Sequence, residues 1–275
     1  MKSIPWTKLH GAENDFLLTW AREVDDIPDA QLPAMARDLC ARTTGIGADG
    51  WMLVEQLNAG LKTRLFNSDG SEPEISGNGT RCAAAFGIAA GVVSPPEIEI
   101  TTAAGRKVLR LLSREGKRFL FEMNMGMPRT EELWAVMDLA GRKFHSTLLN
   151  VGNPQCAIFV DDLPADWRSV AHEAEGHRRF PNRSNVSISR SIDRHTIETV
   201  FYERGAGETR SSGTGSTGAA VAAILRGVAD NPVEVKTPAG SMTVRWDNGV
   251  YLTGPAEIIG EGRYFVDFAN SRAEF

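Results

Sequence analysis

Two stretches of the chain are nearly alike: residues 76–85 read Ser-Gly-Asn-Gly-Thr-Arg-Cys-Ala-Ala-Ala and residues 212–220 read Ser-Gly-Thr-Gly-Ser-Thr-Gly-Ala-Ala. Their first serines lie 136 positions apart, about half of the 275-residue chain. Each serine precedes a glycine-rich turn that leads into alanine-rich, helix-favouring sequence. The free backbone N–H groups and the dipole of such a helix start attract an anion. The pattern therefore predicts two helix N-termini, one per half, that face each other across a cleft and hold one small anion.

The similarity extends beyond the glycines. Residues 66–72, Phe-Asn-Ser-Asp-Gly-Ser-Glu, correspond at the same spacing to residues 202–208, Tyr-Glu-Arg-Gly-Ala-Gly-Glu. One glycine turn is weak evidence, but several blocks aligned in one order indicate a duplicated domain. The period is longer than that of solenoid repeats and favours two domains. We place them at 1–124 and 125–263, and expect residues 264–275 to return to the first.

Composition and charge are those of an ordinary globular protein, with 42% hydrophobic and 24% charged residues. The net charge of −5 argues against a nucleic-acid-binding surface, which is basic. Apolar runs are too short to span a membrane and the N-terminus lacks an apolar signal core, so we expect a cytoplasmic protein. We expect no metal site, and buried, reduced thiols for the three cysteines: Cys40, Cys82 and Cys156.

Hydrophobic periodicity predicts four helices and a larger number of short strands. The helices are expected over residues 29–42, from 77 to about 91, over 167–178 and from 213 to about 227. The first strand is expected within 9–20. Further strands are expected at 51–54, 61–67, 97–101, 107–112, 118–123, before 152, at 156–160, 185–188, 196–203, near 233, and at 242–246 and 250–253.

Five stretches together resemble the diaminopimelate epimerase family. They run in the family's order over nearly the whole chain: Lys-Leu-His-Gly-Ala-Glu-Asn-Asp-Phe at 8–16, residues 66–72, Gly-Asn-Gly-Thr-Arg-Cys at 77–82, Gly-Asn-Pro at 152–154, and residues 202–209. The resemblance implies a mixed α/β (α+β) fold of two similar, pseudo-symmetric domains, each a barrel-like sheet around a central helix. It also implies an isomerase of lysine biosynthesis that interconverts LL- and meso-diaminopimelate in an interdomain cleft, without a cofactor, and usually as a homodimer.

Epimerisation at an α-carbon removes a proton from one face and returns a proton to the other, so it requires two acid/base groups. Dipoles at the two helix N-termini would stabilise the carbanion. The family uses two cysteines, whereas this chain has Ser76 and Ser212 at the corresponding positions, and these are the candidate catalytic residues. A serine hydroxyl alone is a poor base. Gln155 and Gly50 also depart from the family, which has a supporting histidine and often a glutamine there.

The resemblance also implies the substrate-binding residues. It assigns asparagine amides and one Glu-Arg pair to the far end of the substrate, and backbone N–H groups of both glycine turns to its α-carboxylate. The alternative for each asparagine is a plain turn residue, and for each serine a plain helix cap. The candidates are Asn14, Asn67, Asn153, Asn185, Glu203 and Arg204 for the far end, and Gly77, Asn78, Gly213 and Thr214 for the α-carboxylate.

Three explanations fit the serines. They are engineered replacements, although Gln155 argues against that because a designer removing two thiols has no reason to change it. Alternatively, the chain is a natural, divergent relative that acts as an isomerase on another small carboxylate. In the third case it binds an amino acid without turning it over. Because activity does not follow from architecture, the site itself has to decide among them.

Overall fold

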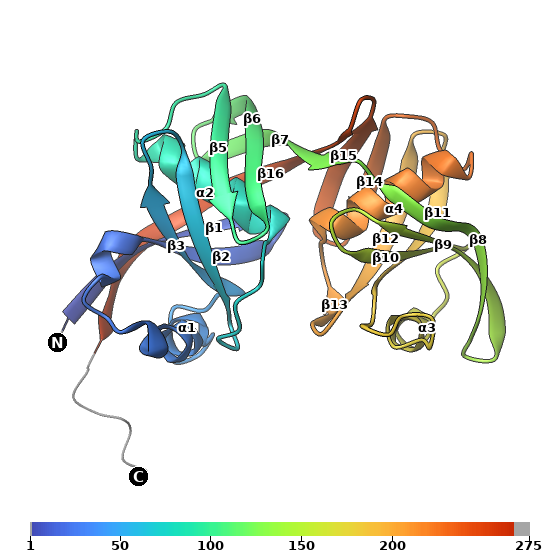
Figure 1. The fold of residues 1–275 in the computed structure, drawn as a ribbon, viewed down its shortest axis with the longest axis horizontal. Coiled ribbons are helices and arrows are strands. Elements are labelled where there is room, and N and C mark those ends of the chain that lie inside the picture. The colour runs from blue at the N-terminus through green and yellow to red at the C-terminus, as the bar shows by residue number, and fades with distance from the viewer. Residues whose placement is uncertain (1, 267–275) are drawn as a thin grey trace, which may run out of the picture. The chain divides into compact units, whose positions relative to one another are not determined.

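The computed structural model describes residues 2–266, and the chain forms two compact units (Figure 1). Of the described residues, the first contains 2–121 and 256–266, and the second contains 122–255. Two long strands, β7 (Arg118–Gly126) and β16 (Val250–Val266), each run from one unit into the other. The boundaries that we placed at 124 and 263 lie inside these two strands.

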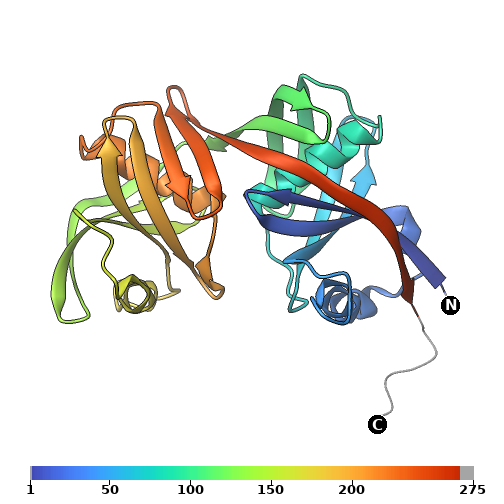
Figure 2. The same cartoon turned by 180° about the vertical axis from the view of Figure 1, so that it is seen from behind.

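The first unit is a closed barrel. β16 pairs antiparallel with β1, from Lys2 opposite Val266 to His10 opposite Glu257, and the two strands run side by side in Figure 2. On its other side, β16 neighbours β7, and the Ile258 N–H donates to the Lys117 carbonyl at 3.0 Å. The remaining strands follow in chain order: β1 (Lys2–Gly11), β2 (Asn14–Trp20), β3 (Gly50–Gln56), β4 (Leu61–Asn67), β5 (Glu97–Thr102) and β6 (Gly105–Glu115).

Helix α2 (Gly77–Ala89) packs inside this barrel and is buried from Asn78 to Ile88. A helix enclosed on all sides needs small side chains, which the alanine run supplies. Helix α1 (Leu32–Cys40) instead packs against β3 and β4 with one apolar face, as its periodicity predicts. Two short 3-10 turns precede it, η1 (Ala21–Val24) and η2 (Asp29–Gln31).

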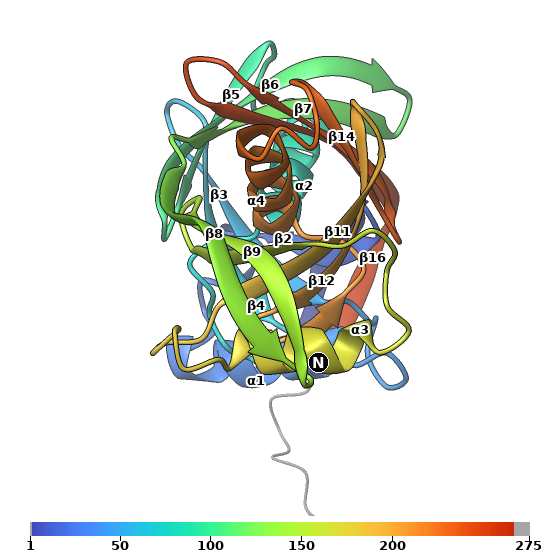
Figure 3. The same cartoon turned by 90° about the vertical axis from the view of Figure 1, so that its right-hand side faces the viewer.

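The second unit repeats this plan with an open sheet ordered β16-β15-β14-β12-β11-β10-β9-β8, and the short β13 pairs with β12. Its strands enclose α4 (Gly213–Leu225), while α3 (Trp167–Glu175) packs against β8, β11 and β12 (Figure 3). The strands are β8 (Arg129–Leu139), β9 (Arg142–Asn150), β10 (Pro154–Phe159), β11 (Asn185–Asp193), β12 (Thr196–Glu203), β13 (Gly207–Thr209), β14 (Val233–Thr237) and β15 (Gly240–Trp246).

The repeated sequence is thus repeated in structure. Helices α2 and α4 are each 13 residues long and begin 136 positions apart. The strands β4 and β12 end at the same spacing, at Asn67 and Glu203. Each unit also has a cis peptide bond before a proline at that spacing, Pro96 and Pro232. The expected mixed α+β fold of two similar units is confirmed.

Several sequence predictions of local structure were wrong. The single strand expected within residues 9–20 is two strands, β1 and β2, joined by a turn in which Ala12 and Glu13 have φ values of 50° and 60°. Such a left-handed turn normally carries Asn or Gly, so this sequence gave no turn signal. Strand β8 was not predicted, and β16 continues well beyond residue 253. Of the stretch expected to return to the first domain, 264–266 belong to β16, and 267–275 lie outside the described residues.

Among the described residues, 2–266, no helix is both long and apolar enough to cross a bilayer.

Candidate active site

Both candidate catalytic serines are helix N-caps. Ser76 has an extended backbone, and its Oγ accepts a hydrogen bond from the Gly79 N–H at 3.1 Å. Ser212 has the same conformation, and its Oγ accepts from the Gly215 N–H at 3.0 Å. The prediction that each serine is a helix N-cap is therefore confirmed for both. A cap and a catalytic group can be the same side chain, so capping does not remove the chemical role.

The Ser212 hydroxyl also has a carboxylate partner, because it donates a hydrogen bond to Oε1 of Glu203. Desolvation by burial raises the pKa of Glu203, and the hydrogen bond from Ser212 only partly opposes this. Ser212 itself is 3% exposed. A desolvated carboxylate in contact with a hydroxyl is an arrangement that can accept the hydroxyl proton.

Ser76 has different surroundings. It is partly buried and lines a cavity of about 170 Å³ together with Met52, Thr80 and residues of the 72–75 loop. The residue at the repeat position of Glu203 is Asn67, whose Nδ2 donates to the Ser71 Oγ at 2.9 Å within the turn after β4. The two serines thus share their capping geometry but differ in their polar neighbours.

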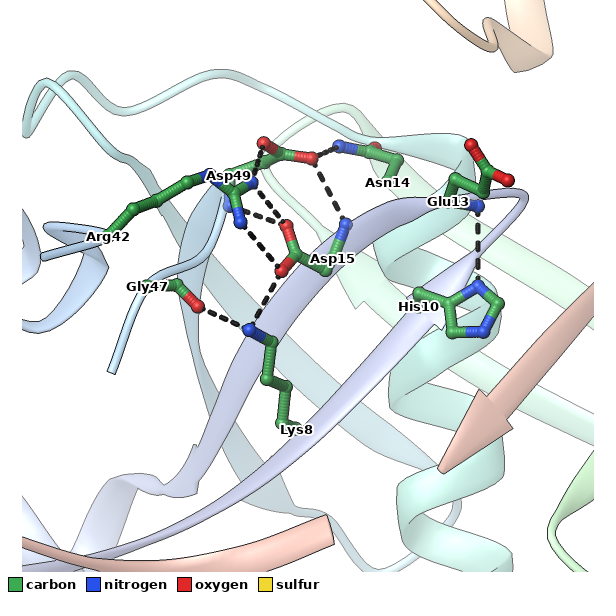
Figure 4. Close-up of polar contacts among 8 residues, drawn as sticks. All are labelled: Lys8, His10, Glu13, Asn14, Asp15, Arg42, Gly47 and Asp49. Atoms are coloured by element: carbon green, nitrogen blue, oxygen red, sulfur yellow. Dashed lines mark hydrogen bonds and ion pairs between the residues drawn. The ribbon is translucent and has the colours of Figure 1, made fainter. Parts of the chain in front are cut away.

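The start of α2 is tied to the β1–β2 turn by asparagine side chains. Nδ2 of Asn78 donates to Oδ1 of Asn14 at 3.3 Å. Nδ2 of Asn14 donates in turn to Oδ2 of Asp49 at 2.7 Å, at the start of β3 (Figure 4). Oδ1 of Asn78 accepts from the guanidinium of Arg81, which is fully buried inside the barrel. The structure therefore brings Asn14 and Asn78 together beside the helix that Ser76 caps.

Asp49 belongs to a charged cluster at the same edge of the barrel (Figure 4). Arg42 Nη2 donates to Oδ1 of both Asp49 and Asp15, at 2.7 and 2.8 Å. Lys8 Nζ lies 2.9 Å from Asp15 Oδ2. Desolvation by burial acts to raise the pKa of Asp15, but the hydrogen bonds and charges of Arg42 and Lys8 outweigh it, and the pKa is lowered.

The start of α4 has a corresponding side-chain contact. Nδ2 of Asn153 donates to Oγ1 of Thr214 at 3.3 Å, and Oδ1 of Asn153 accepts from Nε2 of Gln155 at 2.7 Å. Thr214 occupies the repeat position of Asn78, 136 residues later. Gln155 is buried, so in this chain an amide, rather than the expected histidine, holds the asparagine. Asn153, Thr214 and Gln155 are thus brought together beside the helix that Ser212 caps.

Asn185 lies between two backbone segments of the same unit. Its Oδ1 accepts from the Arg204 N–H at 3.1 Å, and its Nδ2 donates to the Pro154 carbonyl at 3.0 Å. The side chain of Arg204 is exposed, and its Nη1 reaches the Asn182 carbonyl at 3.5 Å. Asn185 therefore joins the Asn-Pro turn to the Glu-Arg turn.

The remaining cysteines do not replace the expected catalytic thiols. Burial raises the pKa of Cys82 and of Cys156 to about 12, so neither is a thiolate at neutral pH. Within residues 2–266, no three His, Cys, Asp or Glu side chains are grouped as metal ligands.

The sequence profile described as diaminopimelate epimerase matches residues 6–131 and 147–259. The chain belongs to this family. A diaminopimelate epimerase from Moorella thermoacetica is 37% identical over 279 residues, covering 95% of this chain and 99% of the relative. One from Nostoc punctiforme is 36% identical with the same coverage of both chains. Family membership supports an epimerase and isomerase.

Solved structures show the same fold at low sequence identity. A phenazine biosynthesis protein of the PhzF family from Bacillus anthracis has a TM-score of 0.73 at 16% identity, covering 97% of this chain and 100% of the other. A hydroxyproline epimerase from Agrobacterium vitis, with bound trans-4-hydroxy-L-proline, has a TM-score of 0.70 at 15% identity, with coverages of 98% and 93%. These likenesses concern the fold alone.

Sequence reasoning missed the charged cluster of this epimerase-family chain. Asp49 stands 136 positions before Asn185, so the repeat itself marks the position. Arg42 has Arg178 at its repeat position, but an arginine after a helix and a carboxylate beside a strand, such as Asp15, are too common to indicate a site. Their role depends on the parallel pairing of β2 with β3, which places Phe16 opposite Gly50.

Proposed function

We propose that this chain epimerises diaminopimelate without a cofactor, with Ser76 and Ser212 as its two acid/base groups. The contact between the Ser212 hydroxyl and Glu203 is the observation that carries the proposal. Serine alone is a poor base, but the desolvated carboxylate of Glu203 beside Ser212 can accept the proton of that hydroxyl. Glu203, which the family resemblance assigned to the far end of the substrate, is thereby given a second role next to the α-carbon.

The helix starts provide the rest of the chemistry. Removal of the α-proton leaves a carbanion whose charge spreads onto the α-carboxylate. The backbone N–H groups of Gly77, Asn78, Gly213 and Thr214 are oriented before the reaction, and such preorganised dipoles stabilise developing charge. The proposal requires both units to reach one substrate, and a ligand-bound crystal structure tests this requirement directly.

The far end of the substrate is an amino acid, with a carboxylate and an ammonium group. The exposed guanidinium of Arg204 suits the carboxylate, since arginine binds carboxylates with two parallel hydrogen bonds. We assign the remaining contacts with this end to the side chains of Asn14, Asn67, Asn153 and Asn185.

Proton exchange at the α-carbon tests the proposal. The chain is incubated with LL- or meso-diaminopimelate in heavy water, and loss of the α-proton signal is followed by NMR, with a cysteine-containing family enzyme as the positive control. Exchange together with LL–meso interconversion supports the proposal. Saturable binding by calorimetry without exchange identifies a binding protein instead. Turnover of another small di- or tricarboxylate, without exchange on diaminopimelate, identifies a divergent isomerase.

We also propose a place in lysine biosynthesis, a cytoplasmic location and a homodimer, with no nucleic-acid or membrane partner. The family membership supports the first of these. Sedimentation equilibrium at micromolar concentration tests the dimer, and a single species with the mass of one chain, 29.9 kDa, would contradict it.

A further inference from the structure

The Asn14 amide lies in the middle of a one-way chain of hydrogen bonds. This series of hydrogen bonds starts at the Arg81 guanidinium, passes through Asn78 and Asn14, and ends at the Asp49 carboxylate. A guanidinium can only donate hydrogen bonds and a carboxylate can only accept them. The two ends therefore fix the direction of every bond between them. Rotating either amide by 180° would place two donors or two acceptors in contact.

The Asp49 end of this chain is itself held in place (Figure 4). Oδ1 accepts from Arg42, and Oδ2 accepts from the Asp15 N–H at 3.1 Å as well as from Asn14. The Asp49 N–H donates back to Asp15 Oδ1 at 3.1 Å. Because both carboxylate oxygens have partners on one side of the barrel edge, the carboxylate cannot turn away from Asn14 without breaking several bonds.

We propose that Asp49, held by Arg42, is a positioning residue that fixes the Asn14 amide for ligand binding. This inference rests on the proposed function, in which Asn14 contacts the substrate. One Nδ2 hydrogen and one Oδ1 lone pair of Asn14 are used within the protein. One donor and one acceptor are left in fixed places, which matches the end of an amino acid with its carboxylate and ammonium groups.

The variant Asp49→Asn removes the acceptor-only group at the end of this series of hydrogen bonds, since an amide can also present its NH₂ group. Calorimetry with meso-diaminopimelate is expected to show a Kd about tenfold higher, the effect of about one hydrogen bond. In exchange assays, KM rises more than kcat falls. Asp49→Glu keeps an acceptor-only group and is expected to retain tighter binding than Asp49→Asn. The control Asp38→Asn makes the same charge change at an exposed position of α1 and leaves Kd unchanged.

A double-variant cycle shows whether Asp49 acts through Asn14. In the background Asn14→Ala, the change Asp49→Asn is expected to cause no further loss of binding. The Asn14 side-chain ¹H–¹⁵N signals, identified by their absence in Asn14→Ala, are expected to shift in Asp49→Asn and not in Asp38→Asn. Losses that multiply in the double variant, or unshifted amide signals in Asp49→Asn, overturn the proposal.

Different results would show that the proposed function, rather than the role of Asp49, is wrong. A wild-type chain that neither binds nor exchanges diaminopimelate overturns that function, while the Asn14 amide signals still decide whether Asp49 positions the amide, because they need no ligand. Thermal melting checks that each variant is folded. If Asp49→Asn is unfolded, Arg42→Lys replaces it. Lysine cannot reproduce the forked contact with both aspartates, and the same binding, cycle and NMR outcomes apply.

Discussion

Glu203 accepts the hydroxyl proton of Ser212 in a hydrogen bond, while the same Ser212 oxygen caps α4 by accepting from the Gly215 N–H. The cap fixes the oxygen at the positive end of the helix dipole, and the carboxylate fixes the direction of its proton. One side chain thereby joins the helix start to a half-buried proton acceptor. At the repeat position in the first unit, Asn67 replaces the glutamate, so the two halves of the duplication have diverged at the residue beside the serine.

The change Glu203→Gln removes the proton acceptor and keeps the shape of the side chain. We expect α-proton exchange to fall by about 10²–10⁴-fold, the usual contribution of a general base, mainly through kcat. The control is Glu208→Gln, which alters a neighbouring carboxylate that pairs with Arg168. Equal exchange rates for Glu203→Gln and wild type would show that the carboxylate takes no part in proton transfer.

The raised pKa of Glu203 also predicts a pH-dependent cost in stability. Between the unfolded value of about 4.3 and the higher folded value, the folded state binds more protons, so this group's contribution falls as pH rises and is constant above the folded pKa. Glu203→Gln lacks this effect. Its melting temperature relative to wild type should therefore be higher at pH 8 than at pH 4, and the opposite trend would contradict the desolvation of this carboxylate.

For Asp15 we expect the opposite dependence of stability on pH. Its pKa is lowered by Arg42 and Lys8 despite burial, so its contribution to stability is present above the unfolded value of about 3.9 and is lost as pH falls through the folded pKa. We expect Asp15→Asn to lower the free energy of unfolding by about 2 kcal/mol at pH 7, and by progressively less below pH 4. Urea titrations across this range measure the difference, and Asp38→Asn should show none of it. A pH-independent loss would mean that packing, rather than charge, is responsible.

The fold could be predicted mainly because the sequence repeats. The glycine turns placed the first residue of α2 and of α4 correctly, since a serine before glycines and then alanines combines a cap with an enclosed helix. The outer helix α1 was predicted from its apolar face, although its first turn is 3-10. The break between β1 and β2 could not be found, because Ala12 and Glu13 are not residues that usually adopt a left-handed turn.

The candidate site could be predicted only in its residue types. The family resemblance named Ser212, Glu203 and Asn14, but it did not indicate which side chains these residues contact. The contact of Ser212 with Glu203 depends on how β12 ends beside the start of α4, and that of Asn14 with Asp49 on the pairing of β2 with β3. Asn14 and Asp49 are 35 positions apart in the sequence. Ser212 and Glu203 are only nine apart, but they belong to different elements, and the local patterns used for prediction do not show how two elements meet.

Restoring thiols tests whether the serines are the altered part of an otherwise intact site. We expect Ser76→Cys/Ser212→Cys to exchange α-protons of diaminopimelate faster than wild type, because a thiol pKa lies closer to neutrality and is lowered at a helix N-terminus. Each single variant is the control and is expected to exchange more slowly than the double variant, because one of its two acid/base groups is still a serine. A double variant that binds diaminopimelate but exchanges no faster would show that the substrate site has diverged beyond the two serines.

The glycines at the third helical position of each repeat predict a measurable difference between the two units. A Cβ on Gly215 would lie 2.7 Å from Cδ1 of Phe201 and 2.9 Å from Cβ of Ser212, whereas on Gly79 its nearest neighbour, at 2.7 Å, is the methyl group of Met52. The buried Phe201 ring cannot move without repacking, but the end of a methionine can rotate away. Gly215→Ala should therefore lower the free energy of unfolding by about 1–3 kcal/mol, as overpacking does.

Gly79→Ala should change stability little, because the better helix propensity of alanine, about 1 kcal/mol, offsets a small shift of Met52. Chemical denaturation of the two variants measures both values. The added Cβ in Gly215→Ala also lies against the Ser212 cap, so Gly215→Ala should slow α-proton exchange more than Gly79→Ala does. If the two alanine variants are equally stable, the α4 start is less tightly packed against Phe201 than the structure requires. The cap at Ser212 would then be free to adjust, and the fixed geometry between Ser212 and Glu203 would no longer hold.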